Sequence, residues 1–316
     1  LIVTPRHDID AVVGRLFGRA VLWAIFVALS MTAILVSTAV QLIRVRARAE
    51  RERHQLLERE LKQAREIQLH WLPRGQVDDP MLEIATVNHP ASRISGDFYN
   101  WFKLPDGRTA VVIGDVTGHG MAAAFLMATT QLLVRNTLPQ AGDPGRCLAE
   151  INRQLCTQVF NGQFVTLQIL IIDSAMGRVE VSTAGHPPPL IHDGVRFEKL
   201  DLEPNLVLGV ERDATYPTER FDLSPESLLL LYTDGAFEAE SPAGEQFGME
   251  RLRRSIDGHS NGAQSLIQAV LDAVDRFRAG RPLADDLTLV AVQLQGRYAD
   301  VPTPEPRRFA EAPATS

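Results

Sequence analysis

Four aspartates stand in short contexts where a carboxylate could meet a metal ion. These contexts are Ser-Gly-Asp for Asp97, Ile-Gly-Asp-Val-Thr-Gly-His-Gly for Asp115, Tyr-Thr-Asp-Gly for Asp234 and Ala-Asp-Asp-Leu-Thr for Asp285. The last three aspartates each adjoin an apolar run with the composition of a β-strand. Because a strand end beside glycine leaves space at the rim of a sheet, we expect accessible carboxylates there.

Several carboxylates gathered at one rim repel one another unless a hard divalent cation joins them. Mg²⁺ and Mn²⁺ prefer oxygen ligands of this kind. A metal ion held by carboxylates, with water in the rest of its coordination shell, is suited to hydrolysing phosphate esters. Each aspartate alone is also compatible with a simple turn, since Asp-Gly is a common turn dipeptide. The four together, within longer sequence strings, favour the metal site.

Those longer strings follow one another along the chain. They occupy residues 95–99, 113–128, 164–167, 184–190, 230–239 and 285–289. Together they resemble the bacterial branch of the metal-dependent (PPM, type 2C) serine/threonine phosphatases, the branch of stage II sporulation protein E and the RsbU regulators. The resemblance covers roughly residues 81–294. It implies an α+β fold, an antiparallel β-sandwich flanked by helices, with the metal ions at one end.

The resemblance also implies a set of metal ligands. They are Asp97, Asp115, Asp234, Asp285 and the backbone carbonyl of Val116. Asp115 would bridge two Mg²⁺ or Mn²⁺ ions, and the sequence does not distinguish the two metals. Two such ions, about 3.5–4 Å apart, can activate a water for in-line attack on phosphorus, so no covalent intermediate is needed. The aspartates would therefore be catalytic through metal-bound water.

Neighbouring residues leave alternatives open. Asp286 either shares the role of Asp285 as a metal ligand or supports the adjacent turn. Asn100 stands where the family usually has a second aspartate, which puts any additional metal ion in question. His119 opens an expected helix, where it could cap the helix or meet the phosphate. His186 is interpreted as a structural turn residue, and Arg93 is the nearest arginine that could bind phosphate.

The composition limits the possible functions. The chain has 316 residues, 45% of them hydrophobic, and a net charge of −7, so most of it should fold and nucleic acid is not an expected ligand. Cys147 and Cys156 lie in an expected helix. Nine residues of helix place them about 13 Å apart on opposite faces, which is too far for a disulfide. We expect buried thiols in a reducing compartment.

Residues 20–43 carry no charge. As a helix they would extend about 36 Å, more than the ~30 Å hydrocarbon core of a bilayer. They continue directly into a charged helix rather than a cleavage site, which favours a membrane span over a signal peptide. Five arginines follow the span: Arg44, Arg46, Arg48, Arg51 and Arg53. The positive-inside rule then predicts a single-pass protein of the inner (cytoplasmic) membrane with its catalytic domain in the cytoplasm.

Residues 44–72 form the predicted linker, because residues 44–71 contain no glycine or proline and read as one helix. Leu57, Leu61, Ala64 and Gln68 recur as a narrow stripe on this charged helix. The stripe is compatible with a solvated spacer or with a short coiled coil that makes a homodimer. Residues 64–73 resemble the linker that precedes this phosphatase branch, which favours the dimer.

The sequence pattern divides the chain into five segments. We expect a short N-terminal segment at 1–19, the span at 20–43, the linker at 44–72, the phosphatase domain at 81–295 and a disordered tail at 296–316. Within the domain, the sequence predicts a hairpin at 104–108, helices at 119–136, 145–159 and 264–278, and a closing strand at 287–294. Strands, then helices, then strands again suit separate layers rather than alternating βαβ units.

The sequence therefore predicts a membrane-anchored, metal-dependent protein serine/threonine phosphatase. By resemblance, its substrate would be a small phosphoserine or phosphothreonine protein of the anti-sigma-factor antagonist type. The alternative is a non-catalytic signalling scaffold that keeps the phosphatase fold. A nucleotide cyclase or kinase is disfavoured, because the sequence has no phosphate loop or dinucleotide fingerprint.

Overall fold

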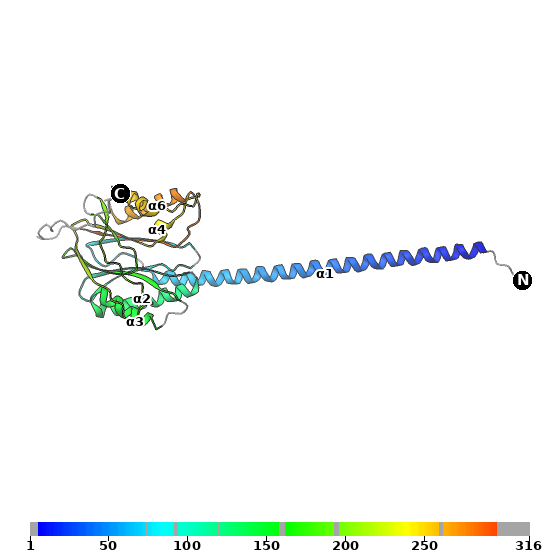
Figure 1. Cartoon of the computed structure of the whole chain (residues 1–316), viewed down its shortest axis with the longest axis horizontal. Helices are drawn as coiled ribbons and strands as arrows, with labels where there is room; N and C mark the ends of the chain where they lie inside the picture. Colours follow the sequence, from blue (N-terminus) through cyan, green and yellow to red (C-terminus); the bar gives the residue numbers. More distant parts are fainter. Residues whose placement is uncertain are drawn as a thin grey trace, which may run out of the picture. The chain divides into compact units, whose positions relative to one another are not determined.

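The computed structural model of the chain describes residues 6–73, 75–91, 94–118, 120–157, 162–192, 196–258 and 262–295 (Figure 1). The chain divides into two units, Leu1–Leu61 and Lys62–Ser316. Helix α1 (Arg6–Trp71) supplies the described part of the first unit and the opening residues of the second. The predicted tail at 296–316 lies outside the described residues.

The first unit is helical from Arg6 onward, so the helix begins well before the predicted span. The stretch Leu16–Trp71 has an apolar window of mean hydropathy 2.3, and none of that window is buried. The hydroxyls of Ser30, Thr32 and Thr38 each donate to the carbonyl four residues earlier, at 2.8–2.9 Å. These hydroxyls therefore need no outside partner. By length and composition alone, this helix could cross a membrane.

The second unit is built on two antiparallel sheets. Sheet A orders its strands β1-β10-β9-β6-β7, and sheet B orders its strands β2-β3-β4-β5-β8. Sheet A comprises β1 (Leu82–His89), β10 (Leu287–Leu294), β9 (Leu228–Tyr232), β6 (Leu190–His192) and β7 (Phe197–Lys199). Sheet B comprises β2 (Phe98–Lys103), β3 (Thr109–Val116), β4 (Val165–Asp173), β5 (Arg178–Ala184) and β8 (Glu219–Asp222).

Helices cover the outer face of each sheet (Figure 1). Helices α2 (Met121–Ala141) and α3 (Pro144–Leu155) pack on sheet B. Helices α4 (Gly235–Glu238), α5 (Gly248–Ile256) and α6 (Ala263–Arg278) lie over sheet A. The predicted fold class, an antiparallel sandwich between helical layers, is confirmed.

Both faces of the central strands are buried. This burial explains why the sequence of β9 is apolar throughout. Leu229 and Leu231 belong to the core that includes sheet B. Leu228, Leu230 and Tyr232 belong to the core beneath α5 and α6. Because side chains alternate along a strand, one apolar run serves two hydrophobic layers.

The structure departs from the predicted elements in two places. Helix α2 continues to Ala141 although it contains Pro139, whereas the sequence predicted an end near residue 136. Val134 and Leu138 are fully buried there, and Gly142 ends the helix in a left-handed conformation (φ 61°). Tertiary packing thus outweighs the proline. Helix α5 was not predicted; it is only nine residues long and buries Leu252 and Ile256.

Candidate metal-binding active site

The structure brings the four motif aspartates to one end of the sandwich. Asp97 directly precedes β2 and Asp115 lies near the end of β3, and the pairing of Phe98 with Gly114 places these two aspartates side by side in sheet B. In sheet A, Tyr232 pairs with Leu289, so Asp234 and Asp285 flank the same end of the β9–β10 pair. Carboxylates separated by up to 188 residues in the chain therefore share one rim.

The glycines of these motifs are required by close approach of the backbone. A β-carbon at Gly96 would lie 2.6 Å from the Val116 carbonyl oxygen and 2.9 Å from Oδ1 of Asp115. A β-carbon at Gly235 would lie 2.1 Å from the carbonyl oxygen of Asp286. Only glycine allows these segments to approach so closely. At Gly96 this approach brings the segment before Asp97 against the Asp115 carboxylate and the Val116 carbonyl, both of them predicted ligands.

Asp97 is buried and held through its side chain. Its carboxylate accepts a hydrogen bond from the Thr233 hydroxyl at 2.8 Å, and that hydroxyl also accepts from the backbone N–H of Thr288 at 2.9 Å. The backbone N–H of Asp97 donates to the Ser95 hydroxyl at 3.0 Å. Thr233 thus ties Asp97, at the edge of sheet B, to both central strands of sheet A.

Asp285 and Asp286 are adjacent but differ in their surroundings. Asp285 is exposed, and its carboxylate accepts from the backbone N–H of Asp286 at 2.8 Å. Asp286 is buried, and its two oxygens accept from the backbone N–H groups of Ala91 at 2.7 Å and Gly96 at 2.8 Å. The neighbours are therefore not interchangeable in the fold.

The carboxylates repel one another strongly. Burial, followed by the negative charges of Asp234 and Asp285, raises the pKa of Asp115 to about 7. Burial, followed by the charges of Asp285 and Glu238, raises the pKa of Asp234 to about 6. Burial, with the charge of Asp115 second, raises the pKa of Asp97 well above its usual range. Carboxylates that repel one another in this way are stabilised either by binding protons or by binding a cation.

The donor set suits a hydrated hard cation. Among the described residues, no three carboxylate, imidazole or thiolate side chains converge as a closed metal cage would require. Mg²⁺ is usually held by only one or two carboxylates and keeps several waters. Paired carboxylates with the neighbouring Val116 carbonyl are an arrangement of that kind.

Two other residues singled out by the sequence make structural contacts inside the domain. Asn100 is buried and donates to Oε1 of Gln131 on α2 at 3.1 Å, which makes it a contact between strand and helix. The His186 ring shares a hydrogen bond with the Thr166 hydroxyl at 2.9 Å, and its backbone N–H donates to the Thr183 hydroxyl, as expected of a structural residue. His119 and Arg93 lie outside the described residues.

The two cysteines are both free thiols. Cys147 is buried within α3, while Cys156 is only partly buried at the end of that helix. The prediction of unpaired cysteines is confirmed.

Sequence reasoning missed Gln68 and the supporting role of Thr233. The Gln68 side chain donates to the Ser95 carbonyl at 2.5 Å and accepts from the Ser95 backbone N–H at 3.2 Å. Gln68 was expected in a seam between two copies of the chain, but it is buried against its own domain. The sequence signal for this role was the polar amide of Gln68 in the otherwise apolar stripe of the linker helix.

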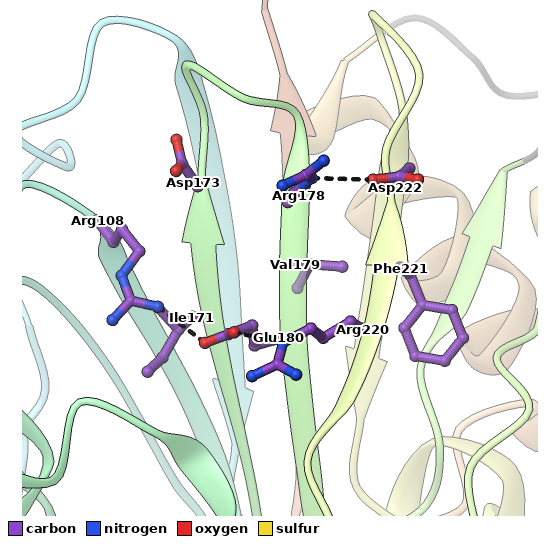
Figure 2. A pocket seen from close by; sticks show the side chains of 9 residues that line it. All are labelled: Arg108, Ile171, Asp173, Arg178, Val179, Glu180, Arg220, Phe221 and Asp222. Carbon is purple, nitrogen blue, oxygen red and sulfur yellow. Dashed lines mark hydrogen bonds and ion pairs between the residues drawn. The ribbon is translucent and has the colours of Figure 1, made fainter. Parts of the chain in front are cut away.

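A separate hollow of about 410 Å³ lies on sheet B (Figure 2). Glu180 is at its centre, ion-paired with Arg108 at 2.8 Å and with Arg220 at 2.7 Å. Arg108 precedes β3 whereas Asp115 lies near the end of β3, so the hollow and the aspartates are at opposite ends of that strand. Its charges are largely paired, and it is not part of the candidate active site.

Comparisons with known proteins agree with this geometry. A family model described as stage II sporulation protein E (SpoIIE) matches residues 105–295. The chain is 27% identical over 262 residues to protein IcfG of Synechocystis sp., an alignment that covers 74% of this chain and 41% of that protein. It is 26% identical over 241 residues to phosphoserine phosphatase RsbP of Bacillus subtilis, covering 75% of this chain and 58% of that protein. The chain thus spans only about half the length of these relatives.

A solved structure shows the same fold. The SiaA-PP2C domain of Pseudomonas aeruginosa superposes with a TM-score of 0.67 and 19% sequence identity, over 77% of this chain and 98% of that one. The family model covers more than half of the chain and includes the Asp115, Asp234 and Asp285 strings. The chain therefore belongs to the stage II sporulation protein E family.

Proposed function

We propose that this chain is a metal-dependent protein phosphatase that hydrolyses phosphoserine or phosphothreonine. The main support is the convergence of Asp97, Asp115, Asp234 and Asp285, from two sheets, at one rim of a phosphatase fold. Their mutual repulsion favours a divalent cation there. The name of the relative RsbP, a phosphoserine phosphatase, supports the same activity.

Two Mg²⁺ or Mn²⁺ ions would be held by these four carboxylates and by the carbonyl of Val116. When bound, such ions supply an activated water and neutralise phosphoryl oxygens. The protein side of the mechanism is positioning: Thr233 orients the Asp97 carboxylate, and Gly96 lets the segment that leads to Asp97 approach the Asp115 carboxylate and the Val116 carbonyl. Asp285 is exposed at the rim, where a phosphorylated side chain can approach it together with the metal.

The proposed substrate is a small phosphoprotein of the anti-sigma-factor antagonist type. The family resemblance and the relative RsbP support a phosphoprotein rather than a small-molecule ester. The site lies at an open strand end, which suits a protein substrate that presents one phosphorylated side chain.

We also propose that α1 anchors the phosphatase to the inner membrane as a single span at residues 20–43, with the domain in the cytoplasm. The unburied apolar window and the arginines that follow it support this topology. A homodimer formed through the linker at residues 44–72 remains part of the proposal, although Gln68, which is buried against its own domain, would not lie in the seam.

The alternative is a scaffold that keeps the fold without turnover. A direct test is to incubate the detergent-solubilised full chain with a phosphoserine protein and Mn²⁺, then measure released phosphate and retained protein complex. The phosphatase proposal predicts phosphate release that stops when a chelator removes Mn²⁺. Stable binding without Mn²⁺-dependent release would favour the scaffold.

A further inference from the structure

The Asp286 side chain contacts the turn that leads to Asp97, a segment that lies far from it in the sequence. Its Oδ1 accepts from the Ala91 N–H at 2.7 Å and its Oδ2 from the Gly96 N–H at 2.8 Å. These partners are 195 and 190 residues away in the chain. Hydrogen bonds from N–H groups to an ionised carboxylate are shorter and stronger than neutral ones. One buried side chain therefore fixes two points of the segment that leads into β2.

The backbone of Asp286 is itself fixed. Its N–H donates to the Asp285 carboxylate at 2.8 Å, and its carbonyl oxygen lies 3.3 Å from the Thr233 hydroxyl, whose proton is donated to Asp97. The carbonyl also packs so closely on Gly235 that no side chain would fit there. The backbone contacts of Asp286 therefore hold the residue in place, and its side chain in turn holds Ala91 and Gly96.

These contacts bear directly on Asp97. Gly96 immediately precedes Asp97, so the bond to Asp286 determines where the main chain of Asp97 enters the site. Thr233 holds the Asp97 carboxylate from the other end. Both supports are hydrogen bonds between groups of the protein itself, so the protein alone supplies the contacts that organise the turn.

We propose that Asp286 is a positioning residue that preorganises the Asp97 turn, and that it is not itself a metal ligand. Both of its oxygens already accept a backbone N–H, whereas the exposed carboxylate of Asp285 accepts only the N–H of its neighbour in the part of the chain that the structure describes. Loss of the carboxylate would leave the buried N–H donor of Gly96 unsatisfied, which is costly. The functional part of this inference rests on the proposed metal-dependent activity, while the structural part does not.

The first test is amide hydrogen exchange in the metal-free full chain in detergent. The wild-type protein should show slow exchange at Gly96. The Asp286→Asn variant should exchange at least about tenfold faster there, since its amide group can accept only one of the two bonds. The adjacent Asp285→Asn variant is the matched control and should keep wild-type exchange, because its Oδ1 can still accept the N–H of residue 286.

The second test is a Mn²⁺ titration of phosphatase activity. Asp286→Asn should need at least about tenfold more Mn²⁺ for half-maximal activity, yet regain kcat within a few-fold at saturating Mn²⁺. Asp285→Asn should not be rescued by Mn²⁺, since it lacks a ligand.

Fast exchange at Gly96 in the wild-type protein would overturn the inference without any variant. A metal stoichiometry reduced by one ion in Asp286→Asn, with no rescue, would show that Asp286 is a ligand. If the wild-type protein had no phosphatase activity, the exchange measurement would still test the positioning role.

Discussion

At the scale of single residues, the sequence identified the aspartates that meet at the rim but not the groups that hold them. Asp97, Asp115, Asp234 and Asp285 could be found because each lies in a recognisable string beside an apolar run. The roles of Thr233 and Asp286 depend on contacts with residues 136 and 190 positions away. No local pattern records such contacts, so they required the structure.

His186 gives a prediction about pH. Burial lowers the pKa of this histidine to about 3, whereas an unfolded histidine titrates near about 6.5. Between these values the unfolded chain binds a proton that the folded domain does not. Stability from this group is therefore present above about pH 6.5 and falls by up to about 1.4 kcal/mol per pH unit below it.

Denaturant unfolding of a fragment beginning at Lys62, at pH 7.5 and pH 5.5, measures this effect. His186→Gln should lower the stability at pH 7.5 and flatten its pH dependence. The matched variant His89→Gln, at an exposed position, should keep the wild-type slope. An unchanged slope in His186→Gln would assign the pH dependence to other groups.

At the scale of elements, strands were predicted better than helices. The strands at 228–232 and 287–294 and the hairpin at 104–108 agree with the structure, because uninterrupted apolar runs bounded by turn residues are a strong signal. Helix α5 was missed because it is only nine residues long, and the last turn of α2 was missed because that helix continues past Pro139.

The structure changes the expectation of a dimer seam at the C-terminal end of α1. A hollow of about 280 Å³ with an almost entirely apolar lining separates this end from α2. It is lined by Ala64, Gln68, Trp71, Met121, Ala124, Phe125, Met127 and Ala128. The linker residues of the expected dimer seam at Ala64 and Gln68 thus face α2 of their own chain. The paired bonds of Gln68 with Ser95 connect this helix to the Asp97 turn.

Gln68→Leu should therefore raise the Mn²⁺ concentration for half-maximal activity, by about fivefold to tenfold, because a near-isosteric side chain loses both hydrogen bonds to Ser95. The direction of this shift follows from the bonds to Ser95, which hold the segment that leads to Asp97. Gln63→Leu, at an exposed position on the same helix, is the matched control. Sedimentation of both variants separates the two effects: a gain in dimer with an unchanged Mn²⁺ requirement would make the helix only a tether.

At the scale of the whole molecule, the proposed function joins a membrane-spanning helix to a phosphatase domain in the cytoplasm. The full chain should fractionate with membranes, because residues 20–43 are uncharged and long enough to span them. A fragment beginning at Lys62 should remain in the supernatant. Lys62 is a better start than Leu82, because Leu72 is buried and Asp79 forms a 2.6 Å ion pair with Lys103. Recovery of the full chain in a high-speed supernatant without detergent would contradict the anchor.

The central claim is that the rim aspartates assemble the metal ions that hydrolyse a phosphoserine protein. The most direct measurement is phosphate release from such a protein at low Mn²⁺ by the full chain and by Asp115→Asn, with the exposed Asp257→Asn as the matched control. We expect wild-type activity for Asp257→Asn and loss of activity for a folded Asp115→Asn, because the carboxylate charge is what assembles the ions. Activity of Asp115→Asn within about twofold of the wild-type rate, well inside the loss expected for a missing metal ligand, would contradict it.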